Sequence, residues 1–387
     1  MRAPDFLPSP ARATGAVPVR YRHLDSLRGI AAGLVMWLHF AQAFEDKTSP
    51  TPAFLGFLNT WPKLLDPGRM GVMIFFAISG FVIPRSFGNV RAGSVRRFLI
   101  RRFCRLYPAY WVSILGGLLL WRMSAQTWSW TALAANATML PHTLGQPRLL
   151  GVYWTLEIEL LFYGLCLGLY LARWLERRSV LASLVVLLTA LPRLLKMCDR
   201  FAGTHWTLSQ LQSTTLLSLA VMFWGALFRM AYDETGGFRR DLRAHWRSLG
   251  LVTVLALVLI DVPDKNLKWF LLGLEPGPLP GQLSVLLALV VFTVWVAWLR
   301  VDNTVLTYLG AISYSLYLFH LVAIRWVEWC ISPGEAGLWL RPPLLLCHLA
   351  SAALTVAIAA AVYRWVEKPA IAFGKAMTAQ SRATSGE

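Results

Sequence analysis

An arginine and a histidine within one apolar run have the spacing for acid-base chemistry. Arg28 and His39 stand 11 residues apart in LDSLRGIAAGLVMWLHF. On an α-helix this spacing is about three turns plus 20°, so both side chains project from one face, about 16 Å apart along the axis. Histidine moves protons near neutral pH and arginine binds anions. We therefore predict acid-base or acyl-transfer chemistry at His39. The structural alternative is an arginine that reaches the lipid headgroups and a histidine bonded within the core.

A second group of cations enters an apolar run from a basic loop. In RRFLIRRFCRLYPAYW, Arg102 and Arg105 form an i,i+3 pair on one helix face, followed by Tyr107. Repeated guanidinium forks suit phosphate oxygens, so we predict that this pair binds a phosphorylated cytoplasmic donor. For the arginines that precede the pair, Arg96, Arg97 and Arg101, a stop-transfer cluster is the favoured explanation.

Two carboxylates lie in the apolar run VYWTLEIELLFYG. Glu157 and Glu159 are about 200° apart on a helix, so they cannot both face one cavity. We expect one to line the site and the other to lie nearer the interface or to pair with an arginine, and a purely structural Glu–Arg pair is the alternative. A further apolar frame, YLGAISYSLYLFHL, carries Tyr314 and His320, although small polar groups in membrane helices often only help packing.

The elements that must position these residues are membrane helices. Of the 387 residues, 56% are hydrophobic and 15% are charged, against about 45–50% and 25% in typical globular domains. This composition excludes disorder and points away from a soluble domain. The apolar runs are near the length of about 20 residues that a bilayer core demands. We predict about ten spans, with 126–140 ambiguous: 24–44, 69–88, 98–121, 150–172, 179–196, 207–232, 247–261, 281–299, 303–330 and 341–366.

The net charge of +17 is explained by orientation in the membrane. If the N-terminus is cytoplasmic, 24 of the 37 Lys and Arg residues lie on the cytoplasmic side, 12 lie on the other side, and Arg28 lies at the start of the first span. This bias is what the positive-inside rule requires. The basic loops are short and carry no nucleic-acid-binding motif, so we expect no nucleic-acid partner. We predict an all-α polytopic protein with both termini cytoplasmic: a tail at 1–20, a membrane domain at 21–371 and a tail at 372–387. The five cysteines form no metal-site or disulfide pattern.

Six ordered motifs resemble the membrane-bound acyltransferase-3 family. LDSLRGIAAGLVMWLH resembles its opening signature, including the Arg-x10-His spacing, and GVMIFFAISGFVI its second-helix signature. RRFCRLYPAYW and YWTLEIELLFY are similar to its arginine-pair and glutamate segments, and ISYSLYLFH and YRWVEKPAI to its late-helix and closing signatures. The resemblance covers residues from about 20 to 371 in the family's order.

The resemblance implies a ten-helix enzyme of the bacterial inner membrane. Such an enzyme moves an acyl group, commonly acetyl, from cytoplasmic acyl-CoA to a hydroxyl of a surface polysaccharide, lipopolysaccharide or glycolipid. It implies catalytic Arg28, His39 and Glu159 and an acyl-CoA-binding pair, Arg102 and Arg105. No bound cofactor and no metal are expected. The supporting candidates are Ser79, Tyr107, Glu157, Tyr314 and His320. Met73 replaces a common acidic residue, which argues against an acid there.

The residues leave two mechanisms and two other classes of function open. His39 either deprotonates the acceptor hydroxyl for direct attack on the thioester or carries the acyl group itself. Glu159 would position His39 or the acceptor, and Ser79 or Tyr314 would donate to the oxyanion. The alternative function is a polytopic anion or proton-coupled transporter that uses the same buried groups, but spans one to five are not repeated in six to ten. A scaffold protein would not need Arg28 and His39 on one face.

Overall fold

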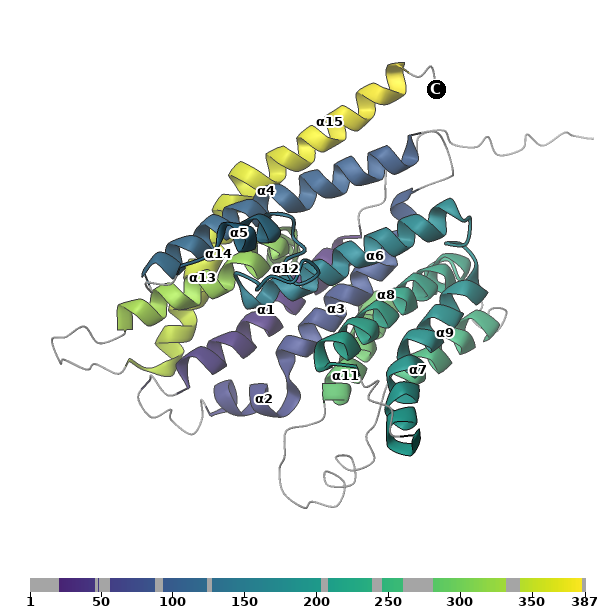
Figure 1. The fold of residues 1–387 in the computed structure, drawn as a ribbon, viewed down its shortest axis with the longest axis horizontal. Helices are drawn as coiled ribbons and strands as arrows, with labels where there is room; N and C mark the ends of the chain where they lie inside the picture. The colour runs from purple at the N-terminus through teal and green to yellow at the C-terminus, as the bar shows by residue number, and fades with distance from the viewer. Residues whose placement is uncertain are drawn as a thin grey trace, which may run out of the picture.

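The described part of the chain is a bundle of α-helices. The computed structural model describes residues 21–45, 48, 56–87, 93–123, 127–202, 208–238, 246–259, 281–331 and 342–384, and none of these residues forms a strand. The helices are α1 (Arg22–Phe44), α2 (Phe57–Leu65), α3 (Pro67–Val82), α4 (Ser94–Met123), α5 (Trp130–Ala137), α6 (Trp154–Leu171), α7 (Arg178–Ala202), α8 (Gln210–Glu234), α9 (Trp246–Leu259), α11 (Gly281–Val294), α12 (Thr304–Ala311), α13 (Ser313–Ile331), α14 (Leu344–Val362) and α15 (Lys368–Thr384). Figure 1 shows their arrangement.

The all-α, polytopic fold predicted from the sequence is confirmed. Within the described residues, seven helices are long and apolar enough to cross a membrane, or eight if α12 and α13 form one broken span. Every predicted span coincides with a helix or a pair of helices, and the ambiguous stretch at 126–140 contains only the short helix α5. The total of ten spans and the cytoplasmic termini remain predictions.

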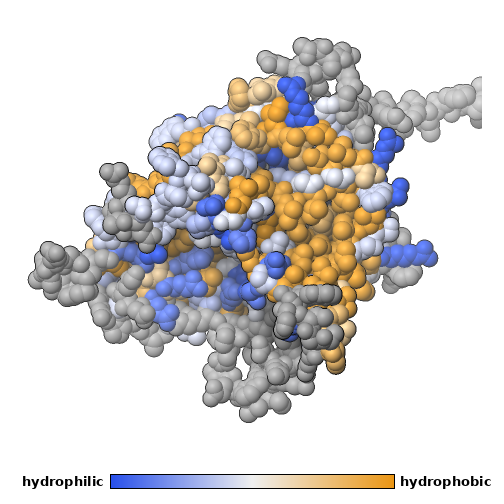
Figure 2. All heavy atoms as spheres, viewed as in Figure 1, coloured by the Kyte–Doolittle hydropathy of each residue, from blue (hydrophilic) through white to orange (hydrophobic). Residues whose placement is uncertain are grey.

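The outer surface is apolar where lipid would lie. Figure 2 shows a broad hydrophobic area on one face, with hydrophilic side chains gathered at its edges and in one part of the face. Helix α7 is the least buried of the long apolar helices, and Leu187, Leu194 and Phe201 on it are more than a third exposed. Such apolar surface is stable against lipid tails and unfavourable in water.

The ninth predicted span is broken, which the sequence did not indicate. Helices α12 and α13 meet at a bend of 74° beside Ile312. The side chain of Asn303 caps α12 by accepting the N–H groups of Val305 and Leu306 at 3.0 and 3.1 Å. Helix α12 packs so closely on α1 that a Cβ built on Gly310 would overlap the backbone of Asp25. Beyond the break, Leu316 in the first turn of α13 belongs to the same buried cluster as Ala32 of α1.

A second close crossing places α3. A Cβ built on Gly80 would overlap the carbonyl oxygen of Met222 on α8, so only glycine allows this approach. Asp66 begins α3: it has a left-handed φ of 41° and accepts the N–H of Arg69 at 2.9 Å, and Pro67 occupies the first turn. Helix α3 thus lies between α1 and α8, with which it has extensive contacts.

The last described segment of the chain, 368–384, is helical. Helix α14 continues through a π-helical turn, Tyr363–Glu367, into α15, which lies alongside α4 in Figure 1. The Nε group of Arg101 on α4 donates to Thr378 Oγ1 on α15 at 3.0 Å. The described part of the predicted tail at 372–387 is therefore helical and contacts α4 at Thr378. Its cytoplasmic location stays a prediction, and the predicted tail at 1–20 lies outside the described residues.

Candidate active site

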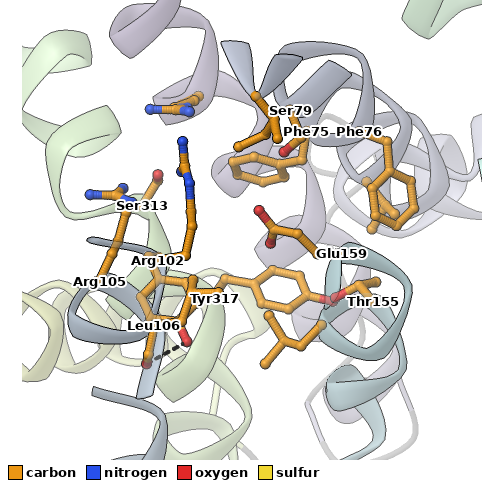
Figure 3. Close-up of a pocket in the computed structure, with 15 residues that line it drawn as sticks. Phe75, Phe76, Ser79, Arg102, Arg105, Leu106, Thr155, Glu159, Ser313 and Tyr317 are labelled. Carbon is orange, nitrogen blue, oxygen red and sulfur yellow. Dashed lines mark hydrogen bonds between the residues drawn. The ribbon is translucent and has the colours of Figure 1, made fainter. Parts of the chain in front are cut away.

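Side chains of five helices line a cavity that is partly open to solvent and that contains most of the predicted site residues; its empty space, with the part open to solvent included, is about 730 Å³. Figure 3 shows Arg102 of α4 and Glu159 of α6 pointing into the same space, with Phe75 and Phe76 of α3 beside them. The polar lining residues are Arg28, Ser79, Arg102, Arg105, Thr155, Glu159, Ser313, Tyr314 and Tyr317, and the apolar ones are Val72, Phe75, Phe76, Ile83, Leu106 and Leu156. The cavity thus has a cationic part and an apolar part.

The guanidinium group of Arg102 is held by aromatic faces. It lies 5.6 Å from the ring centroid of Phe98 and 5.5 Å from that of Tyr163, distances typical of cation–π contacts. The hydroxyl of Tyr163 in turn donates to the carboxylate of Glu159. Arg102 forms no ion pair with any carboxylate of the described residues. Its positive charge is therefore the least compensated of the three arginines that line the cavity.

The other two guanidinium groups each have a carboxylate partner. Arg28 Nη1 lies 3.7 Å from Asp25 Oδ1, and Arg105 Nη1 lies 3.6 Å from Glu367 Oε1. The Glu367 side chain is fully buried and accepts a hydrogen bond of 2.9 Å from Ser315 Oγ. These carboxylates offset the repulsion among three cations that line one cavity.

Glu367 does not line the cavity but pairs with Arg105, which does, and it was not among the residues predicted from the sequence. It belongs to the closing motif YRWVEKPAI and lies in the π-helical turn between α14 and α15. Its signal was a carboxylate at the end of a long apolar run, where a charge is costly unless it is paired. Its pairing with Arg105 could not be inferred from the sequence, because the two residues belong to separate elements far apart in the chain.

Glu157 and Glu159 diverge, as their predicted separation on a helix requires. Glu159 lines the cavity, whereas Glu157 points to the segment after α5. Glu157 accepts from Arg148 Nε at 3.1 Å and from the backbone N–H of His142 at 2.7 Å. Glu157 is therefore a partner in a nearly buried ion pair and does not line the cavity.

His39 does not line the cavity but is joined to it through two aromatic rings. Tyr317 lines the cavity, and its ring centroid lies 5.8 Å from that of His320. The His320 ring lies in turn 5.1 Å from the ring of His39. The Tyr317 hydroxyl donates to the carbonyl of Val152 at 3.1 Å and accepts from Thr155 Oγ1 at 2.9 Å, which holds this ring in place.

The remaining supporting candidates differ in their positions. Ser79 and Tyr314 line the cavity, but the Tyr314 hydroxyl already donates to the carbonyl of Leu106 at 2.9 Å. Tyr107 lies outside the cavity lining: its hydroxyl donates to the carbonyl of Thr138 at 3.0 Å and its ring stacks on Phe103. The half-turn between Arg105 and Tyr107 directs this tyrosine to the segment after α5 instead.

The arrangement suits a ligand with an anionic end and a slender, largely apolar arm. The cationic groups can bind phosphate oxygens in bidentate fashion, and the wall formed by Val72, Phe75 and Leu156 can pack against an arm. Among the described residues no group of three or more His, Cys, Asp and Glu side chains has the geometry to hold a metal ion.

Comparison with known proteins agrees with this picture. A family described as an acyltransferase domain matches residues 21–364. Nodulation protein 10 of Rhizobium leguminosarum bv. viciae is 26% identical over 92% of this chain and 95% of its own length. Acyltransferase MdmB of Streptomyces mycarofaciens is 28% identical over 38% of each chain. No solved structure matches the chain significantly. Because the family match covers nearly all of the helical bundle, the chain belongs to the acyltransferase-3 family and is a multi-pass membrane acyltransferase.

Proposed function

We propose that the protein moves an acetyl group from cytoplasmic acetyl-CoA to a hydroxyl of a carbohydrate acceptor in the bacterial inner membrane. The observation that carries this proposal is the convergence of Arg28, Arg102 and Arg105 on one cavity that leads, through Tyr317, to His320 and His39. The acceptor belongs to a surface polysaccharide, a lipopolysaccharide or a glycolipid. The match to Nodulation protein 10 of a Rhizobium supports a bacterial enzyme.

The donor binds with its phosphates at the cationic part of the cavity. Arg102 has no carboxylate partner among the described residues and offers the strongest site, and Arg28 and Arg105 add to the field. The predicted orientation puts this part on the cytoplasmic side, where CoA is present. The pantetheine arm then runs along Val72 and Phe75 toward Tyr317, so that the thioester approaches the two histidines.

His39 acts as the general base in direct transfer. Its neutral ring takes the proton of the acceptor hydroxyl while the hydroxyl oxygen attacks the thioester carbon. The ester C–O bond forms, the C–S bond breaks, and His39 returns the proton to the CoA thiolate. Because His39 lies beyond the cavity lining, the acceptor reaches it from the side opposite to the donor. The carboxylate of Glu159 is hydrogen-bonded to the Tyr163 hydroxyl, and the ring of Tyr163 lies against Arg102. Glu159 thus orients the side chains that bind the donor.

An assay with radiolabelled acetyl-CoA tests the donor and the base together. The full chain in nanodiscs is incubated with the label and a panel of glycans and glycolipids, beside His39→Ala and the control His142→Ala. His142 is exposed, so its variant should keep full activity. We expect His39→Ala to lose at least about 100-fold, in the range of general acid-base contributions.

The outcomes separate the competing explanations. A labelled acetyl group on His39, found by mass spectrometry after rapid quenching, would replace direct attack with an acyl-histidine relay. Transfer from other acyl donors but never from acetyl-CoA would refute the proposal that acetyl-CoA is the donor. If the label stays on CoA with every acceptor while an anion crosses proteoliposomes that contain the protein, transport is the activity.

A further inference from the structure

His320 is a fully buried histidine on α13 that the proposed mechanism does not use. Its Nδ1 atom lies 2.7 Å from the carbonyl oxygen of Tyr317. A carbonyl oxygen can only accept a hydrogen bond, so Nδ1 must carry the proton. In the neutral ring, Nε2 is then a hydrogen-bond acceptor with an available lone pair.

The Nε2 atom of His320 is buried and has no hydrogen-bond partner among the described residues. A buried acceptor without a donor costs about 1–3 kcal/mol, so such an atom calls for an explanation. The neighbouring group is the ring of His39, whose centroid lies 5.1 Å away at an interplanar angle of 32°. Two imidazoles joined by an N–H···N bond have about this centroid separation. The bond is not formed in the structure, where His39 bonds the Gln42 side chain, so it requires a rotation of the His39 side chain.

A buried Nε2 atom without a partner does not by itself mark His320 as functional, because His348 has one too. Its Nδ1 atom also bonds a backbone carbonyl, that of Leu344 at 3.0 Å, and its Nε2 atom is also buried without a partner among the described residues. However, its ring faces Phe40 and Phe44, which offer no N–H group. Of these two histidines, only His320 faces both a second imidazole and Tyr317, which lines the cavity.

We propose that His320 is a positioning residue for His39: its Nε2 atom accepts the N–H of one His39 ring nitrogen when substrates are bound. The other His39 nitrogen is then the deprotonated one and faces the acceptor hydroxyl. His320 touches neither the donor nor the acceptor and takes up no proton in the reaction. This inference rests on the proposed function of His39 as the base.

Two amide substitutions separate the two nitrogens of His320. In His320→Asn the amide nitrogen lies near the position of Nδ1, so the bond to Tyr317 is kept and the acceptor for His39 is lost. In His320→Gln the amide oxygen can lie near the position of Nε2, so an acceptor is kept and the bond to Tyr317 is lost. The same two changes at His348 serve as the matched control.

We expect His320→Asn to lower kcat about 10- to 100-fold, by analogy with the loss on removing a hydrogen-bond partner that orients a metal-bound histidine. The KM for acetyl-CoA should stay unchanged, because His320 is not part of the cavity lining. His320→Gln should retain at least tenfold more activity than His320→Asn, and both His348 variants should retain similar activity. All rates are measured per folded molecule.

If kcat falls equally in the two His320 variants, or falls further in His320→Gln, the proposal is overturned in favour of a packing role for His320. If both variants fail to fold, ¹⁵N NMR of the histidine-labelled protein with a bound donor analogue and acceptor decides. The His39 resonance, assigned by its loss in His39→Ala, should show a single tautomer, and a mixture of tautomers would refute the inference. If His39→Ala is itself active, the proposed function fails first, which is a distinguishable result.

Discussion

Replacing Arg102 with alanine should weaken donor binding with little effect on folding. Arg102 lines the cavity, is packed against Phe98 and Tyr163, and has no carboxylate partner among the described residues. Its removal therefore leaves no buried charge unpaired. Arg105 is a less suitable target, because its removal would leave the fully buried carboxylate of Glu367 without its cation.

The expected size of the effect follows from these contacts. A hydrogen bond to a charged group contributes about 1.5–3 kcal/mol, so Arg102→Ala should raise the Kd for acetyl-CoA about 10- to 150-fold. The lost cation–π contacts contribute about 0.5–1 kcal/mol each at partly exposed sites. Part of this is regained because the arginine no longer has to be ordered, so the stability should fall by only about 1 kcal/mol.

Calorimetric titration with two donors isolates the phosphate contact. Acetyl-pantetheine lacks the phosphates of acetyl-CoA, so its affinity, measured by competition if it is weak, should be the same for Arg102→Ala and for the unaltered protein. Arg96→Ala is the control, because Arg96 is exposed on the first turn of the same helix. An unchanged Kd for acetyl-CoA, or an equal loss of affinity for both donors, would refute the assignment of Arg102 to the phosphates.

Three further substitutions test the surroundings of the cavity. Glu157→Gln should lower stability by about 3 kcal/mol, because Arg148 loses its partner in a nearly buried pair, but kcat/KM per folded molecule should not change. Gly80→Ala should destabilise the protein by about 1–3 kcal/mol or more through overlap with α8, measured as a fall in Tm. Glu367→Gln leaves Arg105 with an uncompensated charge, so acetyl-CoA should raise Tm more than it does in the unaltered protein.

Each of these predictions has a result that contradicts it. A reduced kcat/KM in folded Glu157→Gln would place Glu157 in the reaction after all. Gly164, whose Cβ would meet no atom within 4 Å, is the control for Gly80, and an equal fall in Tm for both alanine variants would rule out the close crossing. A smaller thermal shift with acetyl-CoA in Glu367→Gln would mean that Glu367 holds Arg105 in its binding position.

The local pattern of the sequence determined most of the helices and the direction of several side chains. The apolar runs predicted the helices because hydropathy and backbone hydrogen bonding are properties of consecutive residues. The helical period alone separated Glu157 from Glu159 and placed Arg102 and Arg105 on one face. Both results hold in the structure, in which Glu159, Arg102 and Arg105 line the cavity and Glu157 does not.

Only the tertiary structure decided which distant residues meet. The run 303–330 is continuous in hydropathy, so its bend of 74° was not visible in the sequence. Next to this bend, α12 fits against α1 so closely at Gly310 that a Cβ there would overlap Asp25. The pairing of Arg105 with Glu367 and the contact of His39 with His320 join helices far apart in the chain. Such contacts depend on how helices cross, which is set by packing between whole surfaces and not by the residues of one helix.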